Sequence, residues 1–280
     1  MKKGINQWSF PASLRLEACL KLAHSAGFDG IELCLEEEGE FSLLTTADQL
    51  AGIARVVESL GLEISSVATG LYWKYSPTAS DPKVRTKALE IARCQLQFAS
   101  ILGADTILYV PGAVNVQWDP ESEVIEYETV YRRAQESLKE LTDLSERLKV
   151  NIGIENVWNK FLLSPLEMRQ FIDEARHPMV GSYFDVGNVL ISGYPEHWIK
   201  ILGNRIKKVH VKDFKTEIGN INGFTNLLQG NVNWPAVVTS LADVGYDGYL
   251  TAEIMPPYRF HAERMIHDIS GALDYILRKT

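Results

Sequence analysis

The sequence has little cysteine, no long apolar run and no cluster of basic residues. Its three cysteines, Cys19, Cys34 and Cys94, are widely spaced, which favours reduced thiols over a disulfide framework or a cysteine metal site. Apolar runs stay well short of the ~18 residues that suggest a membrane span. The first residues, MKKGINQWSF, lead into no apolar core of a signal peptide. We therefore expect a cytoplasmic protein without a membrane partner.

The charge balance disfavours nucleic acid as a partner. The 28 basic and 36 acidic side chains give a formal net charge of −8, a poor electrostatic match to a phosphate backbone. The G-x-G-x-x-G and Walker-type loops that cradle nucleotides do not follow any predicted strand. No linker rich in Pro, Gly or Ser divides the chain either. We expect a single domain over residues 1–280.

What the sequence does contain is a regular alternation of strand and helix patterns. Four times a helical stretch ends in Gly and a β-type apolar run follows within a few residues, as in AGFDGIEL from Ala26 and VGYDGYLTAEI from Val244. Further strands are predicted near the start and at 150–157, 179–186 and 206–211, which makes eight. Helices are predicted at about 13–26, 46–59, 81–102, 125–148, 164–175, 195–203, 234–244 and 260–278.

Strict alternation implies a parallel sheet, and 280 residues divided among eight units give 35 each. That spacing predicts a closed (β/α)₈ TIM barrel of the α/β class, and an open doubly wound sheet is the alternative.

Two helix starts are well marked. Ser164 and Glu167 form a capping-box pattern around Pro165, and Asp81 precedes Pro82.

In a TIM barrel the catalytic residues lie at the carboxyl ends of the strands. Strands five to eight end in ligand-type side chains, namely Glu155, Asp185, His210 and Glu253. Each follows an apolar run, so burying it unpaired would be costly, and three carboxylates at one barrel mouth would raise one another's pKa. A divalent cation removes that penalty. Mixed oxygen and nitrogen ligands suit Mn²⁺, Mg²⁺, Co²⁺ or Zn²⁺.

The chain resembles the xylose-isomerase-like barrel superfamily in the segments IENVWNKFLLSPLEM, YFDVGNVL, VHVKDF, GNVNWPAVV and GYDGYLTAEI. Within it, the chain is similar to the D-tagatose 3-epimerase, L-ribulose-5-phosphate 3-epimerase and hexulose-phosphate isomerase group. The resemblance implies that Glu155, Asp185, His210 and Glu253 bind the metal and that Glu155 and Glu253 are the catalytic acid/base pair. Epimerisation removes a proton on one face of the carbon beside a ketone and returns one on the other, through a cis-enediolate.

The sequence departs from the epimerase pattern around the substrate. Position 188 is Asn where such epimerases often carry His, no Glu follows Glu155 closely, and Lys212 and Lys215 stand where an Arg is common. Strand alternation points Lys212 to the same side as His210, which makes it a candidate for a substrate oxygen or phosphate. We expect the residues that contact the substrate to be Asn156, Asn188, Lys212, Trp8 and Trp158.

Other residues near strand ends receive more modest interpretations. For Tyr72, Trp73 and Trp118 packing is the preferred role, and the run Glu36-Glu37-Glu38 is expected to be a solvated loop. Glu32 lies near the end of the second strand, and two roles stay open for it: ordinary packing, or pointing into the barrel mouth to position a neighbour of the metal. The other histidines, His24, His177, His197, His261 and His267, are expected at the surface or in packing.

The predicted function is a metal-dependent isomerase that epimerises a ketose or ketose phosphate at C3. Its small-molecule partner is a sugar, and assembly into a homo-oligomer stays open. The alternative is an aldose–ketose isomerase or a related enzyme, such as a hydroxypyruvate isomerase or inosose dehydratase. A non-enzymatic sugar-binding barrel is less favoured because both Glu155 and Glu253 are retained. An AP endonuclease-like repair enzyme is remote, because strands three and four end without His and no Asp-x-His follows His210.

Overall fold

A computed structural model describes residues 1–278 and contains a closed barrel of eight parallel strands within that range. Going round the barrel, the order is β1-β10-β7-β6-β5-β4-β3-β2, so the first and last strands pair and close it. All eight predicted barrel strands are confirmed, and the (β/α)₈ architecture with them. The barrel strands are β1 (Lys2–Asn6), β2 (Gly30–Cys34), β3 (Glu63–Ala68), β4 (Thr106–Tyr109), β5 (Asn151–Glu155), β6 (Val180–Asp185), β7 (Ile206–Val211) and β10 (Tyr249–Ala252).

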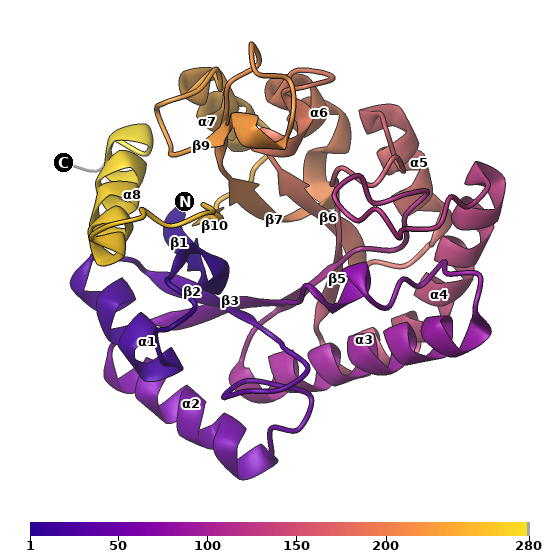
Figure 1. Cartoon of the computed structure of the whole chain (residues 1–280), viewed down its shortest axis with the longest axis horizontal. Helices are drawn as coiled ribbons and strands as arrows, with labels where there is room; N and C mark the ends of the chain where they lie inside the picture. The colour runs from indigo at the N-terminus through magenta and orange to yellow at the C-terminus, as the bar shows by residue number, and fades with distance from the viewer. Residues whose placement is uncertain (279–280) are drawn as a thin grey trace.

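Eight α-helices of the described chain form a ring outside the strands (Figure 1). Their apolar faces and the outer faces of the strands make one continuous core, as expected for helices that cover a parallel sheet. Within residues 1–278, no helix is both long and apolar enough to cross a bilayer. The helices are α1 (Leu16–Ser25), α2 (Ala47–Ser59), α3 (Pro82–Leu102), α4 (Tyr127–Leu148), α5 (Pro165–Glu174), α6 (Pro195–Leu202), α7 (Trp234–Asp243) and α8 (Ala262–Ile276).

The helix starts follow from local side-chain chemistry. Asp81 accepts a hydrogen bond from the Lys83 N–H at 2.8 Å and caps α3, as its sequence pattern predicts. Ser164 caps α5 at the Glu167 N–H, but the Glu167 carboxylate accepts from the Leu163 N–H instead of closing the predicted capping box. The three cysteines are free thiols, in agreement with the sequence.

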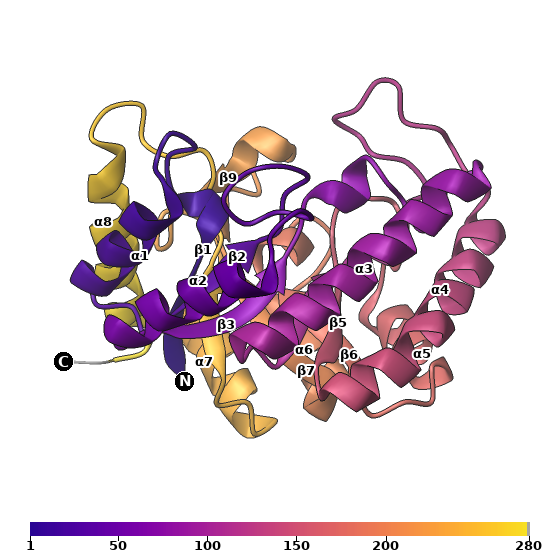
Figure 2. The ribbon, with the colours of Figure 1, turned by 90° about the horizontal axis from the view of Figure 1, so that it is seen from below.

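The long loops gather at the end of the barrel where the strands terminate, opposite the N-terminus (Figure 2). Short elements shape this end, and periodicity alone did not predict them. After β7 the chain forms a small antiparallel pair, β8 (Asp213–Phe214) with β9 (Phe224–Thr225). Short 3-10 helices complete the connections: η1 (Gln7–Ser9), η2 (Leu71–Trp73), η3 (Gly187–Val189), η4 (Gly203–Arg205) and η5 (Ile221–Gly223).

Candidate metal centre and sugar pocket

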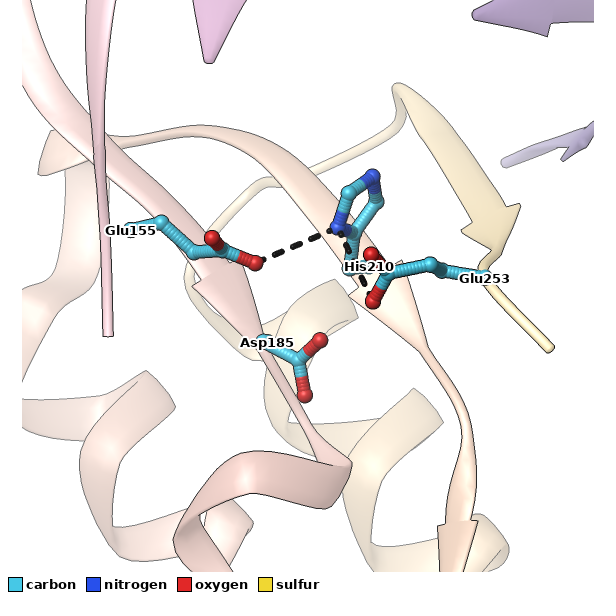
Figure 3. Close-up of side chains that lie close together, drawn as sticks. All are labelled: Glu155, Asp185, His210 and Glu253. Atoms are coloured by element: carbon cyan, nitrogen blue, oxygen red, sulfur yellow. Dashed lines mark ion pairs between the residues drawn. The ribbon is translucent and has the colours of Figure 1, made fainter. Parts of the chain in front are cut away.

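The four predicted metal ligands meet at the mouth of the barrel. Glu155 and Asp185 are the last residues of β5 and β6, His210 is the penultimate residue of β7, and Glu253 directly follows β10. Asp185 and His210 are partners in the β6–β7 register, so adjacent strands place them side by side. Figure 3 shows the four side chains converging from these strands. All four are buried, and one ligand atom from each lies within 4.8 Å of the others.

His210 points its Nδ1 atom into this group. Nδ1 lies 3.4 Å from Glu155 Oε1 and 3.8 Å from Glu253 Oε2, so the two glutamates flank the imidazole from different strands (Figure 3). His210 Nδ1 has no hydrogen-bond partner although it is buried, and Asp185 Oδ2 has only its ion pair with Lys212. Buried polar atoms are almost always satisfied, so His210 Nδ1 marks a place where a further partner fits.

The opposite ring nitrogen of His210 is held by Glu32. His210 Nε2 lies 2.6 Å from Glu32 Oε1, and Glu32 also accepts hydrogen bonds from Asn6 Nδ2 at 2.5 Å, Ser66 Oγ at 2.7 Å and Tyr183 Oη at 2.5 Å. Glu32 therefore points into the barrel, which decides between the two roles left open by the sequence. A carboxylate on one nitrogen of a histidine fixes the tautomer and leaves the other nitrogen free to ligate.

Lys212 also reaches the centre, on the side of the strand that alternation predicts. Its Nζ atom lies 2.9 Å from Asp185 Oδ2 and in direct contact with Glu253 Oε2. Burial alone would lower the pKa of Lys212, but Asp185 and Glu253 outweigh it and raise the pKa above its usual value. The lysine is thus a fixed positive charge inside the centre.

The carboxylates of the centre are harder to ionise than free carboxylates. Burial, reinforced by Glu253, raises the pKa of Glu155 to about 7, and burial also raises the pKa of Asp185. For His210 the burial penalty is outweighed by Glu32 and the neighbouring glutamates, which raise its pKa well above the usual value. These shifts describe a buried cluster with too many negative charges for its own cations.

A divalent cation fits this cluster. Glu32, Glu155, Asp185 and Glu253 carry four negative charges when ionised, Lys212 carries one positive charge, and a histidine that ligates a metal is neutral. Three negative charges therefore remain, and one divalent ion offsets two of them. The separation of the ligand atoms also fits, since metal–oxygen and metal–nitrogen bonds of about 2.0–2.2 Å put opposite donors about 4–4.5 Å apart. Oxygen and nitrogen donors of this kind suit several divalent metals.

The predicted substrate residues surround the centre in different ways. Asn156 is buried and uses both ends of its amide on the backbone of Asp185, at 2.8 Å each, so it braces Asp185. Asn188 donates to the Asn156 carbonyl at 3.0 Å and also lines a cavity in front of the centre. Trp8, Trp158 and Lys212 line the same cavity. Their contact with substrate stays a prediction.

The cavity has a volume of about 850 Å³, and Glu155 and Glu253 form part of its lining. Its walls also contain Trp73 and Trp118, for which the sequence favoured packing, and Phe224, which sequence reasoning missed. Tyr72 is buried and bonded to Gln95, so the packing role is right for that residue. Glu36 is exposed, as predicted for its loop, and it too lines the cavity.

Sequence reasoning also missed Tyr183 and Ser66 as part of the site. Tyr183 lies two residues before Asp185, so strand alternation points the side chains of Tyr183 and Asp185 to the same side, into the barrel. Phe224 could not be recognised in this way, because the sequence does not show how the connection after β7 folds back to the cavity.

Comparison with known proteins identifies the family. The sequence model described as "Xylose isomerase-like TIM barrel" matches residues 20–271. The chain belongs to this family. L-ribulose-5-phosphate 3-epimerase UlaE of Salmonella heidelberg is 24% identical over 286 residues, covering 98% of this chain and 93% of that protein. The uncharacterized protein MJ1311 of Methanocaldococcus jannaschii is 23% identical over 198 residues, which span 68% of this chain and 64% of that protein.

Solved structures of other proteins share the fold. D-psicose 3-epimerase from Clostridium cellulolyticum H10, solved with D-tagatose, superposes with a TM-score of 0.83 at 16% identity and covers 99% of both chains. The IOLI protein with a bound zinc atom gives a TM-score of 0.82 at 18% identity, covering 100% of this chain and 99% of that one. The relatives with named activities are thus sugar epimerases, and the shared architecture is the same barrel.

Proposed function

We propose that this protein is a divalent-metal-dependent isomerase that epimerises a ketose or ketose phosphate at C3. The observation that carries the proposal is the pair of buried carboxylates, Glu155 and Glu253, on two sides of His210 within a ligand set that fits one divalent ion. The named activities of the relatives, L-ribulose-5-phosphate 3-epimerase and D-psicose 3-epimerase, support the same reaction class.

The two glutamates divide the proton transfers. A C3 epimerase must take a proton from one face of the carbon and return one to the opposite face, which requires two groups. Glu155 comes from β5 and Glu253 from the end of β10, and β6 and β7 lie between those strands in the barrel. A substrate carbon placed between them faces a carboxylate on each side. Either glutamate can act as the base, and the direction of epimerisation sets which one.

Glu155, Asp185, His210 and Glu253 would hold the metal, with Mn²⁺, Mg²⁺, Co²⁺ and Zn²⁺ as the candidates. When bound, the ion supplies Lewis-acid stabilisation of the oxygens that become negative in the enediolate. The other parts of the centre position these residues. Glu32 fixes the ring of His210, and Asn156 fixes the backbone of Asp185. Lys212 holds Glu253 and Asp185 at one end of the cluster.

Exchange of substrate protons in deuterated water tests the proposal. Protein loaded with Mn²⁺ is incubated with pentuloses, hexuloses and their phosphates, and the position of deuterium is read by NMR. Deuterium at C3 together with the C3 epimer is the expected result. Deuterium at C1 or C2 would instead identify an aldose–ketose isomerase, and no exchange with any ketose would refute the proposal.

Substitution of the two glutamates links the reaction to the centre. Glu155→Gln and Glu253→Gln should each lower kcat by about 10²–10⁴-fold, the usual contribution of a general acid or base. Glu63→Gln is the matched control, since Glu63 starts β3 at the far end of the barrel and forms an exposed ion pair with Lys2. Both active-site variants retaining wild-type exchange would exclude the two-glutamate mechanism.

A further inference from the structure

The cavity in front of the metal centre is larger than a simple ketose requires. Its volume of about 850 Å³ lies in the upper part of the roughly 300–1,000 Å³ range of sites that hold drug-sized ligands. A pentulose or hexulose placed between Glu155 and Glu253 occupies only the floor. The space above it extends outward between the loops that follow the barrel strands, as far as Trp118, Ile221 and Met255.

Aromatic side chains form the walls of this outer space. The rings of Trp73 and Trp118 make an edge contact with centroids 4.9 Å apart and an interplanar angle of 78°. Gly70 lies beside them, since a Cβ there would make ordinary contacts of 3.7 Å with Trp8 and 4.0 Å with Trp73. These tryptophans follow β1, β3 and β4 in the chain. Phe224 and Trp158, with centroids 4.9 Å apart, come from the connections after β7 and β5.

The same walls carry scattered hydrogen-bonding groups. Asn188, Asn222 and Thr225 line the cavity between the aromatic rings, and the carboxylate of Glu36 lies 3.5 Å from the indole nitrogen of Trp8. Flat apolar faces interrupted by amides, hydroxyls and a carboxylate match a sugar ring, which presents C–H groups on its faces and hydroxyls at its edge.

The charges of the cavity do not match a phosphate. Lys74 and Lys212 are the basic residues among its described lining. Lys74 Nζ pairs with Glu37 at 2.6 Å, and Lys212 is held by Asp185 and Glu253. Lys212 is therefore not free for an anion, Lys74 would have to give up its exposed partner Glu37, and Glu36 adds a carboxylate at the mouth. Arginine and lysine side chains are common phosphate ligands beside backbone N–H groups, and the side chains of this lining offer no unpaired one.

The rim of the cavity leaves apolar surface uncovered. Trp118 is 43% exposed, Ile221 51% and Met255 46%, and all three belong to the same cavity lining. Continuous exposed apolar surface at a cavity mouth is typical of a binding site. A ligand that extends from the metal centre to this rim would cover it.

We propose that the outer space is a subsite for a second ring, so that the substrate is an uncharged ketose linked through a glycosidic bond to another sugar. This inference rests on the proposed ketose chemistry at Glu155 and Glu253. The reacting end of the ketose lies at the centre, and the second ring lies against Trp8, Trp73 and Trp118. The phosphorylated ketose is thereby disfavoured.

Three ketoses that differ at one position test the subsite. D-fructose, isomaltulose (6-O-α-D-glucosyl-D-fructose) and D-fructose 6-phosphate share C1 to C3 and carry a hydroxyl, a glucosyl group or a phosphate at C6. Binding to the Mn²⁺-loaded protein is measured by calorimetry and C3 exchange by NMR. Isomaltulose should bind at least tenfold more tightly than D-fructose, and the phosphate no more tightly than D-fructose. Tighter binding of the phosphate, or equal or absent binding of all three, would overturn the subsite.

A tryptophan variant tests whether the preference for isomaltulose arises at the outer space of the cavity. Trp118→Ala should reduce the isomaltulose-to-fructose affinity ratio at least fivefold, whereas Tyr275→Ala, at an exposed aromatic residue of α8, should leave the ratio unchanged. An unchanged ratio in Trp118→Ala would overturn the proposal. So would dissociation of an oligomer by Trp118→Ala without loss of the ratio, because the rim would then be a contact between copies.

The two proposals fail in distinguishable ways. Selective binding of isomaltulose without C3 exchange of it or of any ketose in the panel would support the subsite and refute the epimerase. Exchange of D-fructose without preference for isomaltulose would support the epimerase and refute the subsite.

Discussion

Replacing Glu32 by Gln tests how the barrel orients His210, one of the proposed metal ligands. The Glu32 carboxylate accepts from Asn6, Ser66 and Tyr183 and contacts His210 Nε2, and all of these partners lie inside the barrel. A glutamine carries no charge and offers one carbonyl oxygen in place of two carboxylate oxygens. If that oxygen stays on Asn6 and His210, the NH₂ group faces the hydroxyls of Ser66 and Tyr183, which must turn to accept. All four contacts are therefore weakened, and the imidazole is held less firmly in one tautomer.

The magnitudes follow from these contacts. Loss of a carboxylate that holds a metal-binding histidine costs about 10–100-fold in metal affinity, equal to about 1.4–2.7 kcal/mol. Hydrogen bonds to a charged group contribute about 1.5–3 kcal/mol each and neutral ones about 0.5–1.5 kcal/mol, so making the four contacts neutral should lower the free energy of unfolding by about 2–4 kcal/mol. Calorimetric titration with Mn²⁺ measures the first quantity and chemical denaturation the second.

Two companion variants distinguish a loss of His210 orientation from a general loss of stability. Tyr183→Phe removes one donor but leaves the contact between Glu32 and His210, so it should destabilise the fold by about 1–3 kcal/mol with little change in metal affinity. Glu63→Gln makes the same chemical change in an exposed ion pair and should alter neither quantity by much. Wild-type Mn²⁺ affinity in folded Glu32→Gln would refute the reasoning.

Further predictions concern metal binding, backbone packing and the thiols. Adding one of the four candidate metals at 100 times its Kd to chelator-treated protein should stabilise it by about 2.7 kcal/mol and raise Tm by about 5–10 °C, and no shift with any of them would contradict a metal site. Gly181→Ala should destabilise the barrel by about 1–3 kcal/mol, because the new Cβ would clash with the Arg205 carbonyl. Gly271→Ala, in open space on α8, should be neutral or stabilising by up to about 1 kcal/mol. Equal unfolding free energies of the two variants would count against this packing. Burial raises the pKa of Cys19 and Cys94 to about 11 and that of Cys34 well above its usual value, so at pH 8 about one thiol in a thousand of Cys19 or Cys94 is ionised, against about a quarter in the unfolded chain. Thiol labelling should thus be slow in the native protein until the pH approaches 11 and fast in denaturant, and rapid native labelling at pH 8 would contradict it.

The sequence is informative about the barrel because the signals are local and repeated. A Gly after a helix and a β-branched run soon after it mark each helix–strand unit, and the end of each run predicts the end of its strand. That is why Glu155, Asp185, His210 and Glu253 could be grouped before the structure: consecutive parallel strands must end at the same face. Their meeting within 4.8 Å is what that reasoning requires.

The parts that could not be predicted depend on long-range geometry. Glu32 and His210 are 178 residues apart, and only barrel closure brings them into contact. Phe224 reaches the cavity through the β8–β9 pair, whose two-residue strands are too short for any periodic signal. Trp73 and Trp118 looked like ordinary packing residues, because nothing in their local sequence shows that the loops after β3 and β4 meet at a cavity.

The order of residues along the chain separates the proposed metal ligands from one part of the cavity wall. Every proposed metal ligand lies between Glu155 and Glu253, in the second half, whereas Trp8, Trp73 and Trp118 come from the first half. Sequence changes in the early connections can therefore reshape what is recognised while the reacting groups stay untouched. Related barrels can then diverge in substrate by altering one half-barrel at a time, and an exchange of early loops between relatives is a natural route to new specificity in this scaffold.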